Sequence, residues 1–351
     1  MNLARIGLAV IAAVMVGVPS MAMGAGAGCA DTFKGKRITL VVPNAAGGGY
    51  DIYARALAPA LTDASGVGVR IVNMPAAGGL VALKHAVQAQ PNEAVMLIES
   101  AIDVIAQEDP PAGMDNWIDM LTPMGTVYTD PEAWFMRKGL ELDGATHHLV
   151  ASVSTFEGNV LPVALASHIL DIKVNMISGY AGSAALMASL LRGEADFTST
   201  SLTTALHAAA TGEAKVGLVM TEGPAPGLPD IPYLAGAGGE VWKHVQGLPE
   251  EQREERLRLA SLIAKATPTT RMLFAPASMD KHLLDCLREA VSASIASDGF
   301  KTAAEAQQRP VDPQDYEHAK ILIDGMLDAF REARTYLTRN PQIVQDARVS
   351  R

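Results

Sequence analysis

The chain has 351 residues, of which 49% are hydrophobic and 19% are charged, and its formal net charge is −10. This composition is typical of a folded globular protein and excludes a disordered one, and the length is enough for about two domains. An acidic chain without a basic patch is a poor partner for nucleic acid, so we expect no such partner.

Residues 1–22 predict a secretory signal peptide. Arg5 precedes an apolar run from Ile6 to Val18, and a small-residue cleavage pattern ends at Ala22. This run is too short to cross a bilayer, and no later apolar stretch reaches the length of a transmembrane helix. We therefore expect the mature protein to be free in an exported compartment, most simply the periplasm.

The chain has two cysteines, Cys29 and Cys286. In an oxidising compartment they can pair, so a disulfide between them is one prediction. The alternative is that Cys29 is a lipid-modified N-terminus, although Gly26 does not supply the large aliphatic residue expected three positions earlier. The cysteines lack metal-type spacing, and adjacent residues such as His147-His148 point to opposite faces of an extended chain, so we expect no metal.

The first part of the chain alternates strands, small-residue loops and helices. We predict strands at 37–43, 69–74 and 94–100, and helices at 51–61 and 80–90. Asp51 is the predicted N-cap of the first helix. Two glycine-rich loops, "NAAGGGYD" and "PAAGG", follow the first and second strands. This alternation predicts a mostly parallel sheet, in which ligands collect at the loops after the C-terminal ends of the strands.

The rest of the chain repeats this pattern and then becomes helical. Residues 149–170 and 171–197 each predict a strand, a turn and a helix, and 198–220 predict a hydroxyl-rich turn, a helix and a strand. Residues 221–240 are rich in Pro and Gly, which indicates a long surface loop or a crossing between lobes. Helices are predicted at 250–266, 279–297 and 312–339.

The order of these motifs resembles one family of receptors. "ITLVVPNAAGGGYDIYARALAPAL", "NMPAAGGLVAL", "STFEGN", "ISGYAGSAALMASLLRGEAD" and "LPDIPYL" are similar to segments of the extracytoplasmic solute receptors of tripartite tricarboxylate transporters, the Bug receptors. The resemblance covers about residues 36–340. It implies an α/β fold of the type II periplasmic binding protein class, with two α/β lobes and a ligand cleft between them. It also implies that backbone amides, hydroxyls and water, rather than arginines, hold the carboxylates of the ligand.

The candidate ligand-binding residues lie in six loops that contain no Lys or Arg. Glycines and helix starts leave amide donors uncovered, and Ser and Thr add hydroxyl donors. Each of these Ser and Thr residues also fits a helix N-cap, and the aromatic residues also fit a lobe core. The candidates are Asn44, Ala45, Gly47, Gly48, Gly49, Tyr50, Asp51, Pro75, Ala77, Gly78, Ser100, Ser154, Thr155, Phe156, Gly179, Tyr180, Gly182, Ser183 and Thr200.

From the chain path we expect lobe I at 31–102 plus 223–345 and lobe II at 103–222, with hinges near Ile102 and Thr221. The predicted function is a monomeric receptor, not an enzyme, that binds a small carboxylate, including dicarboxylic and aromatic acids, and delivers it to transmembrane permease subunits. Phosphate-loop and nucleophile-turn motifs are missing from the sequence, and no cofactor is expected. Two alternatives stay open: a periplasmic sensor subunit for the same solutes, and an exported hydrolase or isomerase on the same frame.

Overall fold

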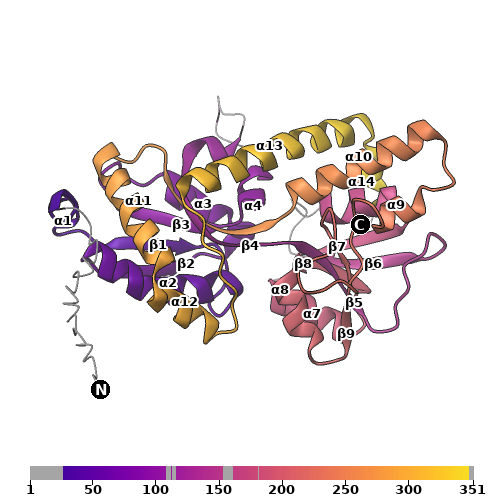
Figure 1. The fold of residues 1–351 in the computed structure, drawn as a ribbon, viewed down its shortest axis with the longest axis horizontal. Helices are drawn as coiled ribbons and strands as arrows, with labels where there is room; N and C mark the ends of the chain where they lie inside the picture. The colour runs from indigo at the N-terminus through magenta and orange to yellow at the C-terminus, as the bar shows by residue number, and fades with distance from the viewer. Residues whose placement is uncertain (1–26, 108–111, 113–115, 153–160, 181, 348–351) are drawn as a thin grey trace, which may run out of the picture.

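The computed structural model describes residues 27–107, 112, 116–152, 161–180 and 182–347. The predicted signal peptide lies outside these residues. Two five-stranded sheets lie side by side along the long axis of the molecule (Figure 1). The first sheet contains β1 (Ile38–Val42), β2 (Val69–Asn73), β3 (Val95–Glu99), β4 (Leu121–Asp130) and β10 (Thr269–Pro276). The second contains β5 (Glu132–Arg137), β6 (His147–Ser152), β7 (Lys173–Ser178), β8 (Phe197–Ser201) and β9 (Ala214–Val219).

The two sheets share one pattern of strand pairing. In the first, the order is β2-β1-β3-β10-β4, and β1 is parallel to both β2 and β3 while β10 is antiparallel to β3 and β4. In the second, the order is β7-β6-β8-β5-β9, with β6 parallel to β7 and β8, and β5 antiparallel to β8 and β9. The C-terminal ends of the three parallel strands therefore lie at one edge of each sheet.

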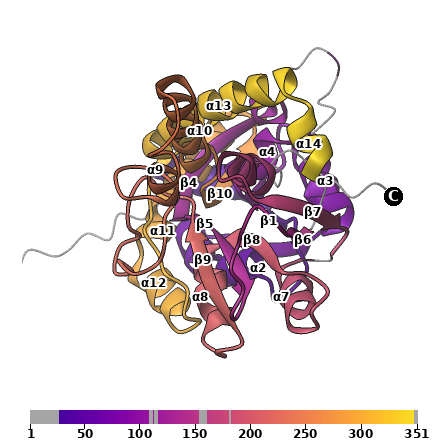
Figure 2. The ribbon, with the colours of Figure 1, turned by 90° about the vertical axis from the view of Figure 1, so that its right-hand side faces the viewer.

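Helices of very different length cover these sheets. The helices are α1 (Ala27–Phe33), α2 (Gly49–Ser65), η1 (Ala76–Gly79), α3 (Leu80–Val87), α4 (Ala101–Ile105), η2 (Trp117–Met120), η3 (Leu161–Leu165), α6 (Ala166–Ile169), α7 (Ser183–Leu191), α8 (Leu202–Ala209), α9 (Glu240–His244), α10 (Glu250–Ala266), α11 (Lys281–Ala296), α12 (Asp298–Glu305), α13 (Tyr316–Arg339) and α14 (Gln342–Ala347). Figure 2, which faces the end with the second sheet, places α7 and α8 on one side of that sheet and α13 and α14 on the other.

The strand sequences explain this layering. On β5, Ala133 and Phe135 pack with the apolar cluster under α7 and α8, whereas Trp134 and Met136 pack with the cluster that extends to α10 and α14. This alternation follows from the two-residue repeat of a strand, which points successive side chains to opposite faces. Because both sets are apolar, the second sheet is buried on both faces.

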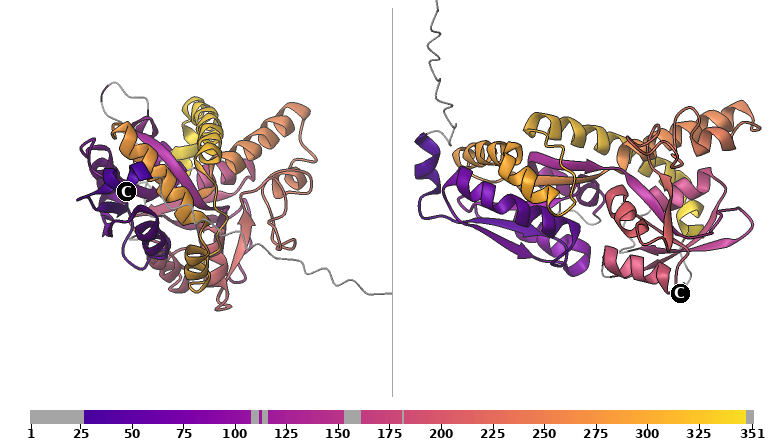
Figure 3. Two further views of the ribbon diagram at one scale, coloured as in Figure 1. Left: turned by 60° about the vertical axis from the view of Figure 1, so that its left-hand side comes forward. Right: turned by 60° about the horizontal axis from the view of Figure 1, so that its bottom comes forward.

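One long helix joins the two halves. The residues of α13 with buried side chains recur every three or four positions, which places them along one stripe of the helix: Ala319, Ile323, Met326, Ala329, Phe330, Ala333 and Leu337. They belong to an apolar cluster that also contains residues of both sheets. Figure 3 shows α13 along one side of the molecule, reaching from the first sheet toward α10 and the second.

The strand pairing differs from the lobe boundaries expected from the sequence. The segment 121–130, expected in lobe II, is β4 of the first sheet, and only Pro131 separates it from β5 of the second sheet. Similarly, α10 packs against α6 and η3 beside the second sheet, and the next element, β10, belongs to the first sheet. The chain thus crosses between the sheets at Pro131 and between α10 and β10, rather than near Ile102 and Thr221.

Two local predictions also need correction. The segment 198–201, predicted as a turn, lies within the strand β8, because Thr has a high β-propensity and Thr198 is fully buried. Asp51 is not the N-cap of α2. That position is Gly48, and Asp51 lies in the first turn of the helix.

A disulfide joins Cys29 on α1 to Cys286 on α11, with the two Cα atoms 5.4 Å apart. Cys29 and Phe33 of α1 are buried against the same apolar cluster as Cys286. A sulfur in a disulfide cannot carry the thioether of a lipid anchor, so this pairing replaces the lipidation alternative. In the part of the chain that the structure describes, no helix is both long enough and apolar enough to span a bilayer.

Replacing both cysteines with serine (C29S with C286S) should lower the free energy of unfolding by about 2–5 kcal/mol, because the bridge closes a long loop and its loss returns entropy to the unfolded chain. The sequence separation of the two residues is 257. Urea denaturation of the mature protein measures the change, and dithiothreitol should reproduce it in the parent but not in the double variant. Equal stability of parent and variant would show that the bridge does not stabilise the fold.

Candidate functional site

The triple-glycine loop uses most of its own hydrogen bonds internally. The amide of Gly47 donates to Asp51 Oδ2 at 2.8 Å, and the amide of Gly48 donates to the carbonyl of Ala45 at 3.2 Å. Gly47 has a φ of 82°, which favours glycine. Two of the three glycine amides therefore shape the loop and are not free for a ligand.

Asp51 is a structural residue of this loop. Its side chain is buried and also accepts hydrogen bonds from Arg55 Nε at 2.8 Å and Asn73 Nδ2 at 3.0 Å. Burial alone would raise the pKa of Asp51, but the hydrogen bonds from Arg55, Gly47 and Asn73 together lower it. Asn73 Nδ2 donates as well to the carbonyl of Asn44 at 3.0 Å, which ties the end of β2 to the loop.

The helix that follows the loop begins without a side-chain cap. Its N-cap is Gly48, which has no side chain to accept from the first amides. The first turn of a helix presents amides without intrahelical partners and carries partial positive charge. The start of α2 is therefore an electropositive point at the C-terminal edge of the first sheet.

The second small-residue loop packs against the protein itself. Ala77, Gly78 and Gly79 all have positive φ. A β-carbon on Gly79 would lie 3.0 Å from Pro43 Cβ and 3.5 Å from Glu99 Oε2, so the loop needs glycine to approach these groups. The carboxyl group of Glu99 thus occupies the space beside Gly79. The candidates Pro75, Ala77 and Gly78 are exposed.

Sequence reasoning missed Arg271, which lies on β10 with 5% of its surface exposed. A β-carbon on Gly49 would lie 3.9 Å from Arg271 Nη2, so the guanidinium faces the start of α2. Its carbon Cζ lies 4.4 Å from the centre of the Tyr50 ring and 5.9 Å from that of Tyr53. These are cation–π distances, and the two rings hold the charge in place.

The guanidinium makes only long hydrogen bonds. Nη1 donates to Tyr50 Oη at 3.3 Å and to the carbonyl of Thr270 at 3.5 Å, and Nη2 donates to Ser201 Oγ at 3.3 Å. Nε is buried without a partner, and the guanidinium forms no ion pair with a carboxylate of the described residues. The sequence did hold one signal for Arg271: it is the only charged residue in the strand-like stretch "TTRMLFAP". Because buried arginines are rare, an arginine in a buried strand indicates a special role.

Four acidic side chains with perturbed pKa values surround this region. Burial is the main cause in each case: it raises the pKa of Asp103 to about 6 and that of Glu132 to about 7, and it raises the pKa of Asp130 and of Glu99 above their usual values. Several have their own partners. The amide of Thr203 donates to both carboxylate oxygens of Asp130 at 3.2 Å, and Thr269 Oγ1 donates to Glu132 Oε2 at 2.8 Å.

The other candidates lie in three situations. Ser100 is fully buried, and its hydroxyl accepts from the amide of Thr270 at 3.1 Å, so it joins the start of α4 to β10. Tyr180 packs with the apolar cluster under α7, and Thr200 is a buried residue of β8. Gly179, Gly182 and Ser183 follow β7 at the strand-end edge of the second sheet. Ser154, Thr155 and Phe156 lie outside the described residues.

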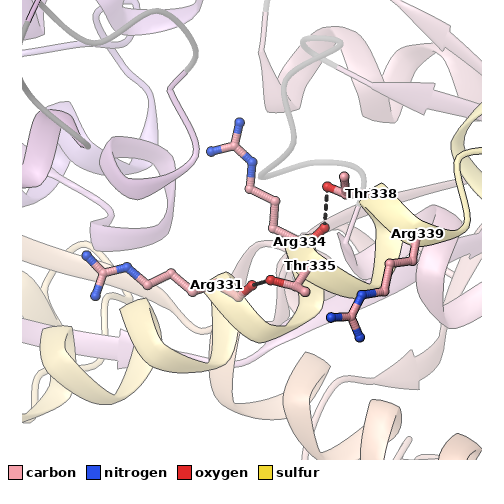
Figure 4. Close-up of a pocket in the computed structure, with 5 residues that line it drawn as sticks. All are labelled: Arg331, Arg334, Thr335, Thr338 and Arg339. Carbon is pink, nitrogen blue, oxygen red and sulfur yellow. Dashed lines mark hydrogen bonds between the residues drawn. The ribbon is translucent and has the colours of Figure 1, made fainter.

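A cavity of about 320 Å³ lies elsewhere, on the surface of α13 (Figure 4). Its lining residues are Arg331, Arg334, Thr335, Thr338 and Arg339. The two threonine hydroxyls donate to carbonyls of their own helix, those of Arg331 and Arg334. We assign no ligand to this cavity because its lining comes from one exposed helix face. Within the described ranges, no group of three or more His, Cys, Asp or Glu side chains could hold a metal ion.

The comparisons with known proteins agree with the fold. No protein-family model matches the chain. It is 25% identical over 232 residues, 63% of this chain and 72% of the relative, to a UPF0065 protein of Bordetella pertussis strain Tohama I. Among solved structures, the periplasmic binding protein BugD has a TM-score of 0.62 and 20% identity, over 85% of this chain and 98% of that chain. The chain resembles the Bug receptors, as its motifs predicted.

Two further structures similar to the Bug-like fold contain acids. MatC of Rhodopseudomonas palustris, solved with bound malate, has a TM-score of 0.64 and 18% identity over 86% of this chain and 99% of that chain. An R. palustris protein solved with adipate has a TM-score of 0.62 and 18% identity over 90% and 99%. The chain therefore has the type II periplasmic binding protein fold with two α/β lobes, one built on each sheet.

The raised pKa of Glu132 predicts a pH dependence of stability. The folded state holds this proton more tightly than the unfolded state, whose pKa is near 4.5, so the contribution is full below pH 4.5 and is lost as the pH rises through about 7. Between pH 5 and pH 8 the parent should lose on the order of 1–3 kcal/mol of unfolding free energy that Glu132→Gln keeps. Urea titrations at both pH values measure this, with the exposed Glu141→Gln as control. Parallel pH slopes for parent and E132Q would contradict the assignment.

Proposed function

We propose that the protein is a periplasmic receptor that binds a small carboxylate and delivers it to the transmembrane permease subunits of a tripartite tricarboxylate-type transporter. The observation that carries the proposal is the buried guanidinium of Arg271 beside the uncapped start of α2, because both attract an anion. The malate and adipate bound to two proteins of the same fold support a carboxylate as the ligand. The permease partners and the monomeric state follow from the resemblance to the Bug receptors.

The location of the site also fits a receptor that closes on its ligand. Arg271 belongs to the first sheet, and its contact Ser201 belongs to the second. A ligand beside this pair would touch both lobes, and binding to both favours a closed arrangement. The disulfide between Cys29 and Cys286 supports the periplasm, since such bonds persist in oxidising compartments.

Hydroxyl groups near Arg271 do not favour a hydrolase. Ser201 Oγ donates to Thr204 Oγ1 at 3.0 Å and accepts from Arg271 Nη2 at 3.3 Å, and no histidine of the described residues is hydrogen-bonded to it as in a Ser-His-Asp triad. We therefore propose binding without chemical change. A sensor subunit would use the same site and would differ only in its membrane partner.

The purified mature protein should be stabilised by at least one acid from a panel of lactate, malate, adipate and benzoate. Its stability should rise with concentration, by about 2.7 kcal/mol at one hundred times the dissociation constant. Thermal shift measures the binding, and mass spectrometry after prolonged incubation should recover the acid unchanged. Turnover of the acid would replace the receptor by an enzyme, and the absence of stabilisation by every acid would refute a carboxylate receptor.

A further inference from the structure

We infer that Arg271 is the anchor for the carboxylate of the ligand, and that this ligand carries one carboxylate and a hydrogen-bond donor, as a hydroxy or amino monocarboxylic acid does. The inference rests on the proposed function and names the substrate class of that site. It departs from the expectation that amides and hydroxyls alone hold the carboxylate.

The guanidinium of Arg271 has unused hydrogen-bonding capacity. A buried cation is costly unless it is paired and hydrogen-bonded, and guanidinium groups prefer a carboxylate that they meet with two parallel hydrogen bonds. Arg271 has no such partner in the described part of the chain, Nε is unbonded, and the hydrogen bonds of the guanidinium, at 3.3–3.5 Å, are longer than the usual 2.7–3.2 Å. The residue thus keeps donor capacity that a ligand can use.

The acids near Arg271 do not take the place of a ligand carboxylate. Asp130 directs both carboxylate oxygens to the amide of Thr203, and Glu99 Oε1 accepts from the amide of Ser100 at 2.8 Å. Asp130 is also hydrogen-bonded to the side chains of Thr203 and Ser201, and Glu99 to that of Asp103, so these acids already have partners other than the guanidinium.

Two independent sources of positive potential, the start of α2 and the Arg271 guanidinium, face each other. The start of α2 has no side-chain cap, and a β-carbon on Gly49, its first residue, would contact Arg271 Nη2 at 3.9 Å. Helix N-termini and arginine both bind carboxylates, so an anion between them gains from both.

The acids then select the rest of the ligand. Across β10, Glu99 pairs with Met272 and Asp130 pairs with Thr269, so acidic side chains flank the strand that carries Arg271. Thr269 Oγ1 also donates to Glu132. The six candidate loops contribute no Lys or Arg. One carboxylate is compensated by Arg271, whereas a second would lie among acidic side chains with no further cation from these loops to compensate it. A hydroxyl or ammonium group would instead find acceptors.

The ligand class is tested with three acids of equal carbon number: lactate, propionate and malonate. Calorimetric titration of the parent should give the order lactate, propionate, malonate from tight to weak, with lactate at least about tenfold tighter than malonate, as one hydrogen bond to a charged group implies. Malonate binding as tightly as lactate would overturn the inferred class. Failure of all three and of the wider acid panel would overturn the proposed function itself.

The anchor is tested by Arg271→Met and Arg271→Lys. The methionine variant should lose about tenfold to a hundredfold in affinity for lactate, and the lysine variant should lose less, because it keeps the charge but not the paired donors. The matched control is Arg288→Met, since Arg288 also lies over a ring, that of Tyr316 at 4.0 Å. Binding of lactate by a folded R271M at parental affinity would overturn the anchor while leaving the receptor proposal intact.

A second pair of variants keeps the test valid if R271M does not fold. A β-carbon on Gly49 meets no atom other than Arg271 Nη2 within 4 Å, so a side chain fits there. Gly49→Asp places an internal carboxylate next to the guanidinium, whereas Gly49→Asn places a neutral group of the same shape. We expect G49D to have a higher melting temperature without ligand than G49N and to lose lactate binding. Equal melting temperatures, or parental lactate affinity in G49D, would overturn the inference.

Discussion

A single buried positive charge without a carboxylate partner governs this structure. Arg271 is 5% exposed, lies within cation–π distance of the rings of Tyr50 and Tyr53, and faces the uncapped start of α2. A protein interior tolerates such a charge only where something compensates it; here burial alone would lower the pKa of Arg271, but nearby groups including Asp130 and Glu99 raise it, while its Nε has no hydrogen-bond partner. The start of α2 after the glycine loop, the buried acids and the junction of the two sheets all lie around this charge.

The charge also lies where the two lobes meet. Asp130 ends β4 in the first sheet and Glu132 begins β5 in the second, so the crossing at Pro131 is flanked by a buried and a half-buried acid, both with raised pKa values. Arg271 reaches Ser201 of the second sheet from the first. A hinge motion moves its equilibrium only by the difference in ligand affinity between the two states. An anion that contacts Arg271 at this junction can supply such a difference.

Local sequence patterns predicted the alternation of strands and helices through β3 and the long helices α10, α11 and α13, because the apolar residues of these elements recur with a strong period. The strands β4, β5 and β10 were missed because their partners lie far away in the chain, and with them the positions of the two crossings. The two glycine loops follow β1 and β2 as predicted, and within the first of them Gly47 and Asp51 bond to each other. Arg271 could not be predicted from loop patterns because it lies inside β10. Only the pairing of β10 with β3 and β4 brings it close to the loops.

The crystal structure of the mature protein with lactate tests the central claim most directly. The account predicts the lactate carboxylate within hydrogen-bond distance of the Arg271 guanidinium and the first amides of α2, with the hydroxyl of lactate directed to one of the buried acids. Lactate bound away from Arg271, with the guanidinium still lacking a carboxylate partner, would contradict it.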